Sequence, residues 1–232
     1  MANKHYTLSP HPQGSPGWLL EIALTSTDMG ILMKHNSYET MDRVINKFKT
    51  GTRVSLPSNY DMERGVRLEP DVRARFGVYL NTIWKNVTIR EVGLARSIEY
   101  PFFGTSVDGL IYIDNIETDW CLEIKCPRRM YPDIEEYRER KEEGGVGGEK
   151  EEGDKEKREG GYGHIEPGHY DQMQWHCLVL GKKGCFYVVY VEDTSDLFIQ
   201  YVPRDDPYIH TLVQAGLKFF QQLPTLMLES ST

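Results

Sequence analysis

Cysteine is scarce in this sequence, and no two cysteines are close enough to form a C-x-x-C pair. The 232 residues include only Cys121, Cys126, Cys177 and Cys185. Structural zinc sites and disulfide-stapled folds need cysteines in paired spacing or in larger number. The spacing therefore argues against a zinc ribbon, and the tight cysteine triplet usual for an iron–sulfur cluster is also missing. We expect four reduced thiols among apolar neighbours.

Long hydrophobic runs are also missing. The longest is "CFYVVYV", residues 185–191, and the opening "MANKHYTLSPHPQGSPGW" has no apolar stretch typical of a secretory signal. A helix needs about 20 predominantly apolar residues to cross a bilayer. We therefore expect a soluble intracellular protein of the nucleus or cytoplasm that does not engage membranes.

The excess of positive charge that is common in nucleic-acid-binding proteins is absent. The net charge is −8, from 35 acidic and 27 basic residues. Between Glu135 and Glu159, 11 acidic and 7 basic residues account for half of this excess. Any contact with DNA must therefore use a local groove, and some acidic residues are candidates for holding a metal ion.

One tract has almost no apolar residue. It is "ERKEEGGVGGEKEEGDKEKREGG", residues 139–161. Such a composition cannot bury enough surface to offset the entropy lost on ordering. We predict a flexible Gly/Glu/Lys-rich insertion, at about 139–161, within a single domain that spans residues 1–232.

The rest of the chain alternates helical and strand patterns, which predicts an α/β (α+β) fold with a central mixed sheet flanked by helices. Helices are expected at 24–33, 38–48, 70–83, 169–181 and 208–223, and strands in 104–127 and at 185–192 and 197–203. In the third helix, Pro70 suits the first turn. Its predicted core face is Val72, Phe76, Leu80 and Ile83.

Charged residues lie inside the segment "GTSVDGLIYIDNIETDWCLEIKCP", residues 104–127, which otherwise has the pattern of two strands joined by a turn. Because side chains alternate along a strand, Glu123 and Lys125 point to one side. The turn brings Asp108 near Glu123, and two neighbouring carboxylates repel unless a hard cation lies between them. Gly109 would let a ligand approach the backbone closely. Oxygen ligands favour Mg²⁺ or Mn²⁺ over zinc, and a lysine there can position a water or stabilise charge on a phosphate.

Several motifs, taken together and in this order, resemble a known group of enzymes. "SVDGL" followed by "LEIKCP" resembles the PD-(D/E)XK nuclease motif, and more narrowly that of phage lambda-type exonucleases and YqaJ-type viral recombinases. "RGVRLEPDVRARF" with Glu69 is similar to the first family motif, and "YDQMQW" to its later Q-x-Q helix. "LTSTDMGIL" is similar to the N-terminal helix start, with Thr27 in place of a serine. The resemblance implies a restriction-endonuclease-like core.

The resemblance also implies roles for individual residues. Asp108, Glu123 and the backbone carbonyl of Ile124 would hold the metal, and Glu69 would support a second metal or its water shell. Lys125 would position or activate the attacking water. The reaction would be metal-assisted hydrolysis of a phosphodiester.

The same resemblance extends to DNA contacts. Gln172 would contact the scissile region or the outer shell of the metal, and the DNA-binding candidates are Ser26, Thr27, Gln174, Arg128 and Arg129. The sequence differs from the family pattern at two places. Valine replaces the usual proline in "SVDG", and residues 18–21, "WLLE", occupy the place of an arginine that binds phosphate in relatives.

The function implied is a Mg²⁺-dependent DNA exonuclease, with Mn²⁺ as a substitute, in recombination, repair or viral DNA processing. The resemblance further implies a trimeric homo-oligomer and a single-strand annealing protein as partner. A structure- or site-specific endonuclease on the same core is the alternative enzyme. A non-catalytic nucleic-acid-binding module would be expected to lack Asp108, Glu123 or Lys125, and all three are present.

Overall fold

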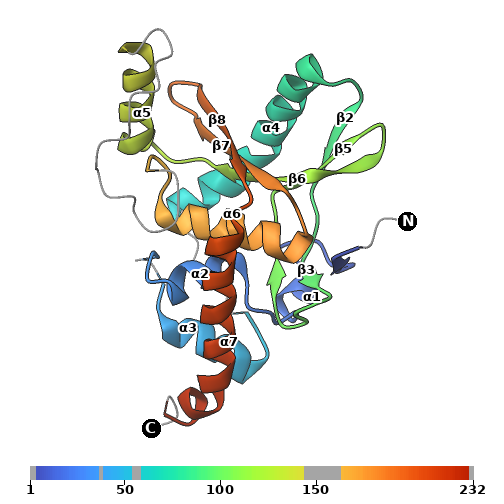
Figure 1. The fold of residues 1–232 in the computed structure, drawn as a ribbon, viewed down its shortest axis with the longest axis vertical. Coiled ribbons are helices and arrows are strands. Elements are labelled where there is room, and N and C mark those ends of the chain that lie inside the picture. The colour runs from blue at the N-terminus through green and yellow to red at the C-terminus, as the bar shows by residue number, and fades with distance from the viewer. Residues whose placement is uncertain (1–3, 37–38, 54–58, 144–162, 230–232) are drawn as a thin grey trace.

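The computed structural model describes residues 4–36, 39–53, 59–143 and 163–229 (Figure 1). The helices are α1 (Pro16–Leu19), α2 (Ser26–Leu32), α3 (Met41–Thr50), α4 (Tyr60–Ile83), α5 (Pro132–Glu143), α6 (Pro167–Leu180) and α7 (Asp206–Glu229). The strands are β1 (Tyr6–Leu8), β2 (Val87–Arg90), β3 (Ala95–Ser97), β4 (Gly104–Thr105), β5 (Gly109–Ile113), β6 (Ile116–Lys125), β7 (Gly184–Val191) and β8 (Asp196–Pro203). The first residues of the expected insertion, 139–143, belong to α5, and the rest of it lies outside the described residues.

The main sheet is mixed, as the sequence predicts. Its strand order is β2-β5-β6-β7-β8, with β6 and β7 parallel and every other pair antiparallel. Two parallel neighbours need a crossover, and α5 and α6 lie in the connection between β6 and β7. A second, antiparallel sheet has the order β1-β3-β4.

Helices cover both faces of the main sheet (Figure 1). On one face, α4 packs against the strand side chains that point toward it. Its buried residues there are Leu68, Val72, Phe76 and Leu80. On the other face α6 crosses the sheet, with α2, α3 and α7 beyond it. Within the described residues, no helix combines the length and apolar character needed to span a membrane.

The β5–β6 hairpin carries the charged segment. Its turn residues Asp114 and Asn115 have positive φ angles of 51° and 64°, as a tight two-residue turn requires. At the open end, Gly109 pairs with Leu122. A Cβ atom at Gly109 would overlap the Ile89 side chain on β2, so the glycine allows neighbouring strands to pack. Strand packing is thus a reason for this glycine that the sequence does not indicate, and close approach of a ligand to its backbone stays a prediction.

The α4 prediction also needs correction. The helix begins at Tyr60, after Asn59 whose side chain accepts a hydrogen bond from the Met62 N–H, so Pro70 lies inside the helix and not in its first turn. The predicted core positions Val72, Phe76 and Leu80 are confirmed. Ile83 is 53% exposed and does not belong to that face, because the helix ends as the chain turns toward β2.

Candidate active site

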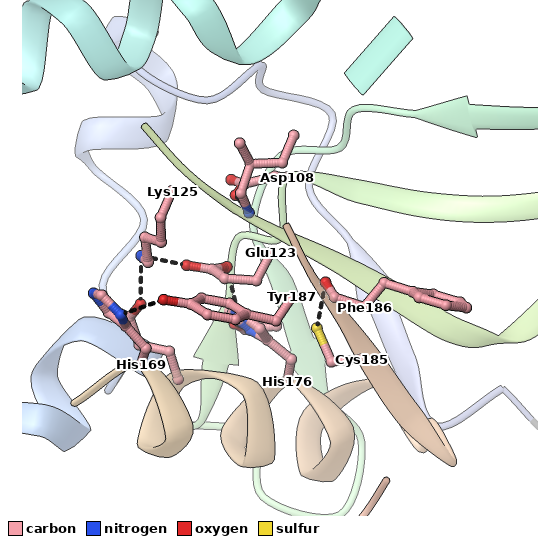
Figure 2. Close-up of polar contacts among 11 residues, drawn as sticks. Asp108, Glu123, Lys125, His169, His176, Cys185, Phe186 and Tyr187 are labelled. Atoms are coloured by element: carbon pink, nitrogen blue, oxygen red, sulfur yellow. Dashed lines mark hydrogen bonds and ion pairs between the residues drawn. The ribbon is translucent and has the colours of Figure 1, made fainter. Parts of the chain in front are cut away.

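The predicted strand alternation places two charged side chains toward α6. Leu122 and Ile124 pack with α4, whereas Glu123 and Lys125 lie on the opposite side of β6 (Figure 2). Asp108 lies just before β5 and stays beside β6, because its Oδ2 accepts a hydrogen bond of 2.6 Å from the Ile124 N–H. The hairpin therefore brings Asp108, Glu123 and Lys125 to one end of the sheet.

Lys125 joins the strand to α6. Its Nζ donates to Glu123 Oε1 at 2.6 Å and to Gln172 Oε1 at 2.7 Å (Figure 2). Burial is the largest influence on this ammonium and lowers its pKa, but the charges of Glu123 and Asp108 outweigh burial and raise the pKa overall. Lys125 is therefore a fixed positive charge between two neighbours.

Glu123 is buried and uses both carboxylate oxygens. Oε1 accepts from Lys125, and Oε2 lies 2.8 Å from His176 Nε2. Burial alone would raise its pKa, but the Lys125 charge and the His176 hydrogen bond hold the pKa well below its usual range. Glu123 is therefore an ionised carboxylate inside the protein.

The pKa of Asp108 is shifted in the opposite direction to that of Glu123. Burial, followed by the negative charges of Glu123 and Glu69, raises its pKa well above the ordinary value. The Lys125 charge and the Ile124 hydrogen bond offset only part of this effect. A divalent cation would relieve the repulsion, so the donor set suits a hard metal ion.

The residues at this site suit a cation that takes few protein ligands. In the described part of the chain, no three His, Cys, Asp or Glu side chains converge to hold a metal ion. Mg²⁺ usually keeps several waters and takes one or two carboxylates plus substrate phosphate oxygens. Asp108 and Glu123 match that requirement without a third carboxylate.

Glu69 is engaged elsewhere. It forms an ion pair with Arg73 one turn along α4. The same guanidinium donates from Nε to the Asp108 carbonyl oxygen at 2.6 Å and from Nη1 to Glu91 at 3.2 Å. Arg73 therefore ties α4 to the turn that carries Asp108. No motif in the sequence marks Arg73 for this role, although its spacing of four residues from Glu69 is the usual signal for a helical ion pair.

The two glutamines of "YDQMQW" have different positions. Gln172 reaches Lys125, whereas Gln174 is fully buried, donates to the Pro203 carbonyl and accepts from the Asp205 N–H. Residues two apart on a helix are separated by about 200° around its axis. The expected DNA contact by Gln174 is therefore wrong, and this side chain fixes α6 to the start of α7.

Of the other residues predicted to contact DNA, three are exposed and one is buried. Thr27 is exposed at the start of α2, but Ser26 is buried. Arg128 and Arg129 are exposed just past β6, and they line a depression of about 790 Å³ together with residues of the β7–β8 turn. Thr27 and the two arginines are thus accessible to a ligand.

Two further features of the site lie outside the predicted set of residues. His176 lies one turn beyond Gln172 on the same face of α6 and contacts both Glu123 and Thr105. Arg53 stacks on the Trp18 ring at 4.0 Å and donates to the Glu21 carbonyl at 3.1 Å. A guanidinium therefore does reach residues 18–21, but it comes from a segment beyond α3.

Comparisons with known proteins agree with this architecture. The crystal structure of an alkaline exonuclease from Laribacter hongkongensis superposes with a TM-score of 0.65 at 24% identity, covering 94% of this chain and 96% of that one. The same exonuclease in complex with dAMP gives 0.64 at 24% identity and 92% of each chain. A phage-related exonuclease from Haemophilus somnus 129PT gives 0.53 at 12% identity, covering 89% and 96%. These likenesses confirm the predicted fold class.

Sequence comparison identifies the family. No match was found among curated proteins. The family model described as "YqaJ-like viral recombinase domain" matches residues 17–153. That range contains Glu69, Asp108, Glu123 and Lys125, whereas Gln172 and His176 lie beyond it. The chain belongs to the YqaJ-like viral recombinase domain family.

Proposed function

We propose that this protein is a metal-dependent deoxyribonuclease that acts as an exonuclease on the ends of duplex DNA. The observation that carries the proposal is the convergence of Asp108, Glu123 and Lys125 at one end of the sheet, with Gln172 bonded to the lysine. Family membership and a fold shared with two exonucleases support it.

Asp108 and Glu123, with the backbone carbonyl of Ile124, are proposed to hold Mg²⁺, or Mn²⁺ in its place. Such a cation, when bound, polarises phosphoryl oxygens and makes water a better nucleophile at neutral pH. Glu69 is proposed to support a second metal or the water shell of the first while it stays ion-paired with Arg73. The mutual repulsion of the carboxylates supports a cation at this position.

Lys125 is proposed to orient the attacking water and to stabilise negative charge on the phosphate. Its ammonium is held by Glu123 and Gln172, so little reorganisation is needed when charge develops nearby. Thr27, Arg128 and Arg129 are proposed to contact backbone phosphates, which positions DNA without reading its sequence. A trimeric assembly and a single-strand annealing partner remain predictions from the family resemblance.

The test uses linear and closed circular duplex DNA with Mg²⁺ or with EDTA. Wild-type protein should degrade only the linear DNA, and only with Mg²⁺. Lys125→Ala should lose about 100-fold or more in rate, as is typical when a charge-stabilising donor is removed. Lys218→Ala, the same change at an exposed site on α7, should behave as wild type.

Two results would contradict parts of the proposal. Cleavage of the circular DNA would identify an endonuclease on the same core. A folded wild-type protein that cuts neither DNA with Mg²⁺ or Mn²⁺ would exclude both nuclease activities.

A further inference from the structure

A buried hydrogen-bonded chain reaches Glu123 from the second sheet. His176 Nε2 lies 2.8 Å from Glu123 Oε2 (Figure 2). On the other side of the ring, the Thr105 Oγ1 atom on β4 lies 2.5 Å from His176 Nδ1. Thr105 is fully buried and His176 is 1% exposed. Three elements therefore meet in this chain, namely β4, α6 and β6.

The carboxylate fixes the direction of the hydrogen bond between His176 and Glu123. An ionised carboxylate can only accept, so Nε2 of His176 must carry the proton in its hydrogen bond to Glu123. The Thr105 hydroxyl can either donate to Nδ1 or accept from it, so it satisfies the second ring nitrogen in both cases. Thr105 thereby holds the ring in the orientation in which Nε2 faces Glu123, as outer partners at metal sites commonly do.

The opposite oxygen of Glu123 is held independently. Lys125 donates to Oε1 while His176 donates to Oε2, so the carboxylate is restrained at both ends. Each oxygen keeps a further lone pair, because an ionised carboxylate has about four acceptor positions. The carboxylate is thus oriented but still able to bind a cation.

α6 itself is anchored beside this chain. Trp175 is fully buried, and its indole N–H donates to the Gly104 carbonyl on β4 at 3.0 Å. The helix is thereby fixed to the strand that carries Thr105. The position of the His176 ring is set by packing as well as by its two hydrogen bonds.

We propose that His176, held in place by Thr105, is a positioning residue that orients Glu123 for the divalent cation and so determines metal affinity. The inference rests on the proposed nuclease function. Partners of this kind typically change metal affinity or activity by about 10- to 100-fold when removed.

Three substitutions separate this role from simple packing. His176→Leu keeps an apolar side chain of similar size but removes both hydrogen bonds. His176→Gln retains an amide N–H near the position of Nε2. Thr105→Val has nearly the same shape as threonine but lacks the hydroxyl. Val179→Ala is the control, because this buried α6 residue lies in the core and not among the site contacts.

Mn²⁺ binding is measured by calorimetry without DNA, and nuclease rate is measured against Mg²⁺ concentration. His176→Leu should weaken binding about 10- to 100-fold and move the Mg²⁺ midpoint upward. High Mg²⁺ should restore most of the maximal rate. The Mn²⁺ affinity of His176→Gln should stay within about threefold of wild type. The affinity of Thr105→Val should lie between those of the two His176 variants. Val179→Ala should lower stability without moving the midpoint.

A folded His176→Leu protein with wild-type Mn²⁺ affinity would overturn the inference. If that variant does not fold, an unchanged affinity in Thr105→Val overturns it instead. An active wild type with unaffected variants would refute only the positioning role. A wild type that neither binds Mn²⁺ nor cuts DNA would refute the proposed function together with it.

Discussion

Asp108 is held in an environment that disfavours its charge. It is half-buried and repelled by Glu123 and Glu69, while the Ile124 N–H and the Lys125 ammonium compensate in part. Sites that must bind a cation concentrate negative charge before the cation arrives, and this concentration lowers the stability of the free protein.

Asp108→Asn should therefore stabilise the metal-free protein while abolishing its response to metal. The amide oxygen can still accept from Ile124, but the repulsion is gone. In EDTA we expect a gain of about 1 kcal/mol in the free energy of unfolding, within the usual range for such trade-offs. Mn²⁺ should raise the urea midpoint of wild type and leave the variant unchanged. Asp71→Asn, an exposed change on α4, is the control, and a variant less stable than wild type in EDTA would contradict the argument.

Contacts in the site could be predicted from the sequence only where the two residues lie close together along the chain. Asp108, Glu123 and Lys125 lie within 18 residues of sequence, so strand alternation and one turn suffice to bring them together. Thr105 and His176 are 71 residues apart, and nothing local in the sequence indicates their contact. The error at Gln174 came from treating a motif as one surface, although neighbouring motif positions face opposite sides of a helix.

At the scale of elements, most helices and strands were predicted, and α4 shows where local signals fail. Pro70 looks like a helix start, yet α4 begins ten residues earlier. A proline inside a helix leaves the carbonyl four residues earlier without its partner. That carbonyl belongs to Val66, which is 75% exposed, so water can satisfy it. Burial of Arg64 and Leu68 favours the additional turns, and such packing is not visible in the sequence.

Gly109 gives a test of the hairpin's packing. A methyl group there would overlap the Ile89 side chain on β2 and press on Leu122 of β6 at 3.3 Å. Ile89 is branched at Cβ and cannot move aside without shifting β2. We expect Gly109→Ala to lower the free energy of unfolding by about 1–3 kcal/mol, as overpacking typically does, measured by urea denaturation.

The matched control is another glycine, in α4. A Cβ atom at Gly65 would meet nothing within 4 Å, so Gly65→Ala should stabilise the helix by about 0.5–1 kcal/mol. Equal effects of the two substitutions would show that Gly109 is not needed for strand packing.

At the scale of the whole molecule, α6 is the element on which the site depends. Its contacts reach the second sheet through Gly104 and Thr105, the main sheet through Glu123 and Lys125, and the start of α7 through Asp205. Because the net charge is −8, a polyanion is repelled overall, so the proposed DNA binding must rely on local groups such as Arg128 and Arg129 and on any bound cation.

A cation at the proposed site should therefore tighten one region of the protein and not the whole. With Mn²⁺, hydrogen exchange should slow in residues 104–110, 122–126 and 170–177, which hold the site and its supports, because local opening exposes these amides. The Ile124 amide is the sharpest reporter, since its acceptor is the Asp108 side chain and not another strand. Helix α3 packs against α7 on the far side of α6 and should exchange at an unchanged rate. Asp108→Asn should remove the effect, and slowing confined to α3 and α7 would place the cation elsewhere.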